Sequence, residues 1–240
     1  MLVWMGGIAS GLTSCLDTNG GGNYQSFPAA PVVVNHNPEI GGPSLLTTWG
    51  EIAAPELTQF SQGDCLFAQF TIDYDNQPSS LYYTATDVSY SNPINVANAD
   101  IVADSVAVGD YTLPITAINI SPYNNPLLLN GRFFFQMKNN AVDNQSIEYK
   151  LLTSEKEVDN NGVYTMYLVA KQDDSSGTKV DVTRNQVFLI NNLLLTLGKD
   201  TTINTNVRVK YLKVDLKYYT QQSDSAPFTD YGNIELAIYN

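Results

Sequence analysis

Nucleophilic and metal-assisted catalysis depend on a few side-chain types, and this 240-residue chain holds few of them. It has two cysteines, Cys15 and Cys65, and a single histidine, His36. A Ser/His/Asp or Cys/His unit needs a firmly held imidazole, whereas His36 lies in a stretch rich in Asn, Pro and Gly. The sequence has neither a phosphate-binding loop nor a Gly-x-Ser-x-Gly elbow. We therefore predict a protein that is not an enzyme, needs no cofactor and lacks a multi-histidine metal site.

The segment Asp73-Tyr74-Asp75-Asn76 resembles part of a calcium-binding loop, because oxygen ligands at alternating positions suit Ca²⁺. The segment lacks the glycine and the distant bidentate glutamate of a calcium loop, so a solvated hairpin tip is predicted and no metal. Cys65 opens an apolar stretch, where a free cysteine behaves as a small buried hydrophobe. A glycosidase needs only two suitably spaced carboxyl groups, so a carboxylate-only hydrolase stays open as an alternative.

Aromatic residues are the one enrichment that could bind a ligand, because the chain has 15 tyrosines. Aromatic faces beside carboxylates and amides suit sugar rings, through apolar contact and hydrogen bonds to hydroxyl groups. The candidate ligand-contacting aromatics are Trp49, Tyr82, Tyr83 and Tyr90. Tyr111 and Tyr123 lie in the same half of the chain. Tyrosine is also a favoured strand residue, so ordinary packing is the competing interpretation.

Charge divides the chain sharply at Arg132. The residues before it carry eleven acidic side chains and no Lys or Arg, whereas the remainder holds 13 acidic and all 12 basic residues. Binding to nucleic acid or to anionic lipid needs Lys and Arg to replace counterions. The acidic half is therefore predicted to bind neither.

The first residues predict a membrane anchor. Residues 1–14 are apolar or small and end in Leu12, Thr13 and Ser14 before Cys15. This pattern resembles a bacterial lipobox, which directs a thioether-linked diacylglycerol to the cysteine, and two or more acyl chains anchor a protein stably. We expect a signal peptide over 1–14, a lipidated Cys15 and a flexible tether over 15–42. A signal peptide usually begins with Lys or Arg, so we expect the true translation start to lie upstream.

The remainder predicts an all-β protein, because alternating apolar residues and β-branched or aromatic enrichment recur between turn signals. Three Gly-containing turns, at Asn130-Gly131, Asn160–Gly162 and Ser175–Gly177, predict hairpins and an antiparallel meander from Phe133 to Val187. A phase change predicts a bulge at Tyr211-Leu212. One short helical turn is expected at Asn191–Leu197. The charge step suggests domains at 43–124 and 125–240, with a single continuous sandwich as the alternative.

The segment Leu57 to Pro93 resembles the N-terminal domain of NigD-like lipoproteins of Bacteroidetes. It has a turn at Gly63-Asp64, a long apolar strand, an acidic turn and a Tyr-rich strand. The resemblance implies a small OB-like barrel followed by an antiparallel β-sandwich domain, on an outer-membrane lipoprotein with no known reaction. Fimbrillin-type pilus subunits are the competing resemblance. The short tether and the absence of arginine before residue 132 speak against them.

These observations lead to one main functional expectation and two alternatives. We expect a non-enzymatic protein of the outer membrane, anchored through lipidated Cys15, that serves as an accessory or structural subunit beside other outer-membrane proteins. The membrane face is left open, because Asp17 alone stands where surface-exported lipoproteins usually carry an acidic cluster. The alternatives are a surface module that binds a glycan and a fimbrillin-type pilus subunit.

Overall fold

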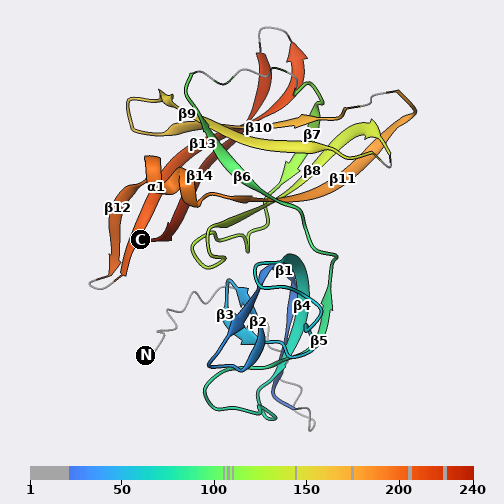
Figure 1. Ribbon diagram of the computed structural model, residues 1–240, viewed down its shortest axis with the longest axis vertical. Helices are drawn as coiled ribbons and strands as arrows, with labels where there is room; N and C mark the ends of the chain where they lie inside the picture. Colours follow the sequence, from blue (N-terminus) through green and yellow to red (C-terminus); the bar gives the residue numbers. More distant parts are fainter. Residues whose placement is uncertain are drawn as a thin grey trace.

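The computed structural model describes residues 22–104, 106, 109, 111–143, 145–173, 176–204, 207–223 and 226–240. Within them the chain builds two β bodies in succession and one short helix (Figure 1). The smaller body, blue to cyan in Figure 1, contains the first five strands, and the larger body contains the other nine. The predicted fold class, an all-β chain with an OB-like barrel before a sandwich, is confirmed.

The first five strands curl into the barrel. They are β1 (Tyr24–Asn37), β2 (Gly42–Thr47), β3 (Gly50–Ala53), β4 (Cys65–Asp73) and β5 (Ala85–Tyr90). Their order is β3-β2-β1-β4-β5, and each neighbouring pair is antiparallel. A parallel bridge from Ala53 to Thr84 brings the two outer strands together, and the Ala53 amide donates to the Tyr83 carbonyl at 2.9 Å. Closure in this order gives the five-stranded barrel of the OB type.

Strand β1 corrects the prediction of a tether through residue 42. Val32 and Val34 point into the barrel core, whereas Val33 between them packs against the second body. All three are almost fully buried, so β1 is a central strand. The surrounding Asn, Pro and Gly residues suggest a linker, but the apolar stretch is stabilised by pairing with β2 and β4, which local composition does not reveal.

The remaining strands form the sandwich. They are β6 (Val96–Val102), β7 (Ile115–Asn119), β8 (Arg132–Val142), β9 (Glu148–Val158), β10 (Tyr164–Lys171), β11 (Lys179–Leu189), β12 (Lys199–Asn204), β13 (Val207–Ser223) and β14 (Ala226–Tyr239). Helix α1 (Asn191–Leu197) follows β11, which confirms the short helical turn expected there. The order is β12-β13-β10-β9-β6-β11-β8-β7, with β14 on β13.

Strand β6 links the two layers of the sandwich. Its first residues pair with β11 and its later residues pair with β9, so the sheet turns a corner at this strand. These two pairings and the pairing of β10 with β13 are parallel, and the other pairs are antiparallel. Phe133 and Phe135 of one layer pack in the same buried core as Leu168 and Val214 of the other.

The predicted meander is correct only at the β9–β10 hairpin, where Gly162 has a φ of 76°. Strand β8 pairs with β7 and β11 instead of β9, because the connections on either side of the hairpin cross between layers. The bulge predicted at Tyr211-Leu212 is absent, and the β13–β14 register shifts between Leu216 and Lys217 instead. Turn residues and parity describe a strand locally, but they do not specify the neighbour it joins.

The strands divide between Tyr90 and Val96, because β6 and β7 join the second body. The charge step had suggested a boundary between residues 124 and 125. That position lies about thirty residues further along the chain than the point where the strands change from one sheet to the other. In the described part of the chain, no helix is long and apolar enough to cross a bilayer.

Candidate functional site

Trp49 is the predicted aromatic that reaches the second body. It lies in the tight turn between β2 and β3, where its amide donates to Thr47 Oγ1 at 3.0 Å. Its ring centroid is 4.9 Å from that of Phe27 in the barrel and 5.0 Å from that of Tyr123, which follows β7. Trp49 is therefore part of the junction between the barrel and the sandwich.

The other three predicted aromatics support loops of the barrel itself. Tyr82 donates its hydroxyl to the Ile40 carbonyl at 3.4 Å, and Tyr83 packs edge-on against Tyr74. Tyr90 packs edge-on against the Phe60 ring, and its hydroxyl accepts a hydrogen bond from Gln59 Nε2. Among the described residues, no ring contact joins any of the three to Trp49. The four candidates do not form a single aromatic face.

The lipobox residues Leu12, Thr13 and Ser14 and the lipidation candidate Cys15 lie outside the described residues. Strand β1 begins at Tyr24, only nine positions after Cys15. Nine residues span at most about 30 Å when fully extended. A lipid on Cys15 would thus hold the barrel close to the membrane surface.

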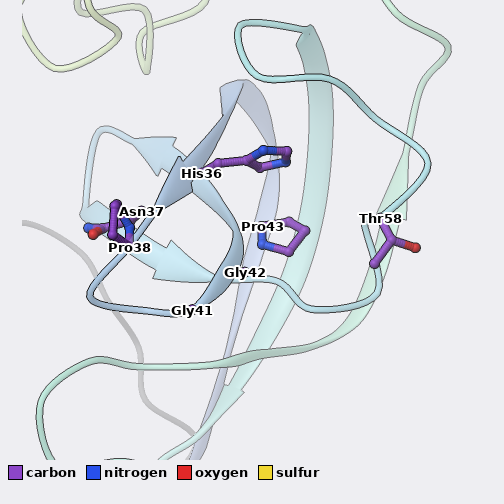
Figure 2. A pocket seen from close by; sticks show the side chains of 7 residues that line it. All are labelled: His36, Asn37, Pro38, Gly41, Gly42, Pro43 and Thr58. Carbon is purple, nitrogen blue, oxygen red and sulfur yellow. The ribbon is translucent and has the colours of Figure 1, made fainter.

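His36 lines an open groove of roughly 410 Å³ at the end of the barrel (Figure 2). Pro43 and Thr58 face the same space, and the β1–β2 turn from Asn37 to Gly42 forms its border. No Asp, Glu or Cys side chain is among the lining residues. The exposed imidazole therefore has no partner for acid–base or nucleophilic catalysis in this groove. The sequence had suggested that His36 lies on a tether, but it lies on strand β1.

The outer face of the same hairpin carries a polar cluster around Glu51. Asn35 donates to Glu51 Oε1 at 2.8 Å, Asn37 donates to Oε2 at 2.9 Å, and Ser44 donates to Oε1 at 2.5 Å. These bonds join β1, β2 and β3 through one carboxylate. The cluster is a brace for the barrel rather than a site with a free acid.

A carboxyl pair is present at the β6–β9 border, where a hollow of roughly 230 Å³ is lined by Asp100 and Glu148. Both side chains belong to exposed residues. Glu148 accepts a hydrogen bond from the Tyr111 hydroxyl at 3.1 Å and lies 3.8 Å from Lys150 Nζ. The general acid of a glycosidase needs apolar surroundings. Glu148 is exposed and paired with Tyr111 and Lys150, so it lacks such surroundings.

Asp73 forms a local turn instead of a calcium loop. Its carboxylate accepts hydrogen bonds from the Asp75 amide at 3.0 Å and from Asn76 Nδ2 at 2.7 Å. These bonds lower the pKa of Asp73, with the bond from Asn76 as the largest cause. Over the described ranges, no cluster of three or more His, Cys, Asp or Glu could hold a metal ion.

The junction between the two bodies has its own apolar core. Val33 and Cys65 of the barrel pack with Leu129, Phe134 and Val187 of the sandwich. The Cys65 side chain is fully buried, as predicted. Burial raises the pKa of its thiol to about 11, although the nearby guanidinium of Arg132 acts to lower that pKa. A thiol in this state is a packing element and not a nucleophile.

A cleft of roughly 240 Å³ opens beside this core, between the barrel and the loop that follows β7. Phe67 of β4 and Phe134 of β8 meet edge to face there, with ring centroids 5.9 Å apart. Tyr123 also lines the cleft, and its ring contacts the ring of Trp49. The lining residues are Ala29, Phe67, Asn119, Ser121, Pro122, Tyr123, Phe134 and Gln136.

Two amide side chains define the polar side of the cleft. Asn119 and Gln136 are directly paired across β7 and β8, so their side chains point to the same face. Phe134 lies two residues before Gln136 on that face. The Asn119 side chain has no hydrogen-bond partner within the described chain, and Gln136 donates to Asn185 at 3.3 Å. The Asn119 amide and the oxygen of the Gln136 amide thus stand beside aromatic rings.

Sequence reasoning noted Tyr123 and identified its neighbour Trp49, but it did not find the other residues that line this cleft. The triplet Phe133–Phe135 was visible as a strand, and its alternation implies that Phe134 faces away from the sandwich core. No pattern in the sequence shows that this outer face meets Phe67 of the barrel.

Three solved structures share this fold across most of their length. A protein of unknown function from Bacteroides vulgatus matches with a TM-score of 0.58 and 11% identity, over 87% of this chain and 90% of that chain. A candidate toxin-related protein from Parabacteroides distasonis matches with a TM-score of 0.52 and 15% identity, over 89% and 93%. A candidate lipoprotein from Bacteroides fragilis matches with a TM-score of 0.53 and 10% identity, over 90% and 97%.

A NigD-like immunity protein from Bacteroides caccae is also among the matching structures, as the sequence resemblance expected. Its TM-score is 0.43, with 12% identity over 88% of this chain and 90% of that chain. A scan of protein-family models and a search of curated proteins gave no match. At their identities of 10–15%, the three matches with TM-scores above 0.5 show a common fold and no more.

Proposed function

We propose that this protein is a lipid-anchored, non-enzymatic protein of the outer membrane that serves as a subunit of a cell-envelope complex. The anchor is Cys15, preceded by Leu12, Thr13 and Ser14. The fold that the chain shares with a candidate lipoprotein from Bacteroides fragilis supports this assignment. The chain from Cys15 to Tyr24 is short, so the barrel would be the body nearest the membrane and the sandwich would extend away from it.

One observation carries the role as a subunit: among the strands that the structure describes, none pairs with the outer edge of β14. This strand of 14 residues pairs with β13 on one side, and no other strand of the described chain pairs with it. A long free edge is a template for another strand, and proteins usually protect such edges with lysine, proline or a short length. Asn233 to Tyr239 keep an uninterrupted register with β13 and contain no Lys.

The side chains along this edge also suit an interface. Tyr231 is 42% exposed and Tyr239 is 58% exposed, and tyrosine is enriched where proteins meet. Backbone pairing to a free edge is a common mode of peptide recognition, in which main-chain hydrogen bonds supply affinity. The partner that fits is an extended strand of another envelope protein.

The two cysteines provide a matched test of the anchor. Cys15→Ala should abolish incorporation of an alkyne-labelled palmitate and should release the protein from the membrane fraction. Cys65→Ala should retain both the label and membrane partition, because Cys65 is enclosed in the junction core. Equal labelling of the two variants would refute acylation at Cys15.

The edge can be tested with a photo-cross-linking amino acid in intact cells. Benzoylphenylalanine at Asn233 or Tyr239 should capture an envelope protein, whereas the same residue at Val180 on β11 should not. Val180 is a suitable control because it is 40% exposed and lies on a different strand. No adduct at either β14 position, or the same adducts at all three positions, would remove the subunit role of β14.

A further inference from the structure

We propose that the cleft between Phe67, Tyr123 and Phe134 binds one uncharged sugar ring. This inference is independent of the lipid anchor and of the β14 edge. It places the glycan-binding alternative at a different location from the one the sequence suggested, because none of the four predicted aromatics lines this cleft and Trp49 only contacts its Tyr123.

The lining is electrically neutral. None of the eight lining residues is acidic or basic, although the chain carries 24 acidic and 12 basic residues. A ligand with a formal charge would find no ion pair here and would lose hydration on entering. The cleft therefore favours a neutral molecule over a uronic acid, a sialic acid or a phosphorylated compound.

The aromatic residues and the amides match the two kinds of surface on a pyranose. Phe67 and Tyr123 line the cleft with aromatic surface, which suits the C–H side of a sugar ring. Asn119 and the Gln136 oxygen can donate to and accept from hydroxyl groups, since an amide carries both kinds of group. A phenyl side chain of a partner protein would leave these amides unused, so the polar complement favours a polyhydroxylated ring.

The size of the cleft limits the ligand to about one ring. Sites for drug-sized ligands usually occupy about 300–1,000 Å³, and this cleft is smaller, at roughly 240 Å³. A single ring at the end or side of a longer glycan would fit, whereas the rest of the chain would extend into solvent.

The cleft is also held in shape before any ligand arrives. The Tyr123 amide donates to Ser121 Oγ at 3.2 Å, and the ring of Tyr123 rests against Trp49. Asn124 ties the same loop to the backbone of Phe134. A preorganised site loses less conformational entropy on binding, so even a small ligand can be retained.

The experiment uses the full chain with Cys15→Ala and measures saturation-transfer NMR with glucose, galactose, mannose, N-acetylglucosamine and glucuronic acid. At least one of the four neutral sugars should bind, with an affinity in the millimolar range. Asn119→Ala should weaken that binding by about tenfold, which corresponds to the loss of one hydrogen bond. Tyr83→Phe, outside the cleft, should bind as strongly as the parent protein.

Asn119→Ala should still fold, because the side chain is exposed and bonds to no other described residue. A second variant, Gln136→Leu, removes the other amide and should give a similar loss of binding. The proposal is overturned if none of the four neutral sugars binds, if glucuronic acid binds as well as they do, or if both variants bind as the parent protein does.

Discussion

The side-chain amide of Asn124 substitutes for a strand beside Phe134. Its Nδ2 donates to the Phe134 carbonyl at 2.6 Å, and its Oδ1 accepts from the Phe134 amide at 3.3 Å. Strand β7 pairs with β8 as far as Asn119 and Gln136, so the Asn124 amide satisfies the next backbone groups along the β8 edge. This contact fixes the loop that carries Tyr123 to the junction.

Asn124→Ala should lower stability by about 2–3 kcal/mol, because it leaves both backbone groups of a buried residue without a partner. Phe134 is only 1% exposed, so water cannot readily replace the lost bonds. Urea denaturation followed by tryptophan fluorescence measures the change, and Trp49 reports on this region directly. Asn119→Ala is the matched control and should change stability by less than about 0.5 kcal/mol. Equal effects of the two variants would contradict the role of Asn124.

A pair of glycines separates backbone strain from steric overlap. Gly131 and Gly41 have nearly the same φ, 74° and 75°, which side-chain-bearing residues rarely adopt. A methyl group at Gly41 would meet open space, whereas one at Gly131 would overlap the side-chain amide of Asn191. Gly41→Ala should cost about 1 kcal/mol from strain alone. Gly131→Ala should cost about 2 kcal/mol, because the exposed Asn191 side chain must also rotate away, and similar melting temperatures for the two variants would exclude the overlap.

The buried thiol of Cys65 makes stability depend on alkaline pH. Its pKa is about 11 in the folded protein and near 9 in the unfolded chain, so between these values the unfolded chain binds fewer protons. Stability therefore falls as pH rises through this window, by about 2–3 kcal/mol at most. The stabilisation is fully present below pH 9.

The measurement compares two proteins, both with Cys15→Ala, of which one also carries Cys65→Ala. The difference between their unfolding free energies removes the contribution of the tyrosines and lysines that titrate in the same range. That difference should shrink from pH 8 to pH 11. A constant difference across this range would show that the thiol is not protected by burial.

The Glu51 cluster predicts a large effect from a single carboxylate. Glu51→Ala leaves the Asn35, Asn37 and Ser44 donors without their acceptor and should cost about 2–4 kcal/mol. Glu39→Ala, at an exposed position in the following turn, should cost less than about 0.5 kcal/mol. Thermal melts of the two variants provide the comparison. A small shift for Glu51→Ala would show that water readily satisfies the three donors.

Features that depend on neighbours in sequence were predictable. Alternation of apolar residues indicated the strands, Leu193, Leu194 and Leu197 supported the short helix, and the apolar stretch after Cys65 indicated a buried thiol. These properties follow from local periodicity and from residue chemistry, which are legible without a fold.

Features that depend on distant partners were not predictable in the same way. The strand nature of Tyr24–Asn37 comes from pairing with β2 and β4. The pairing of β8 with β11 instead of β9 depends on which layer each strand enters, and a turn sequence does not encode that choice. The contact of Phe67 with Phe134 joins residues of different bodies.

The sequence by itself determined that this is an all-β chain that is acidic in its first half, and it predicted a lipidation motif at Cys15. Only the tertiary structure decided that Trp49 meets Tyr123, that Asn119 stands beside Gln136, and that β14 keeps a free edge. The physical reason is that β-sheet pairing and interdomain packing join residues far apart along the chain, whereas periodicity and composition report only on neighbours.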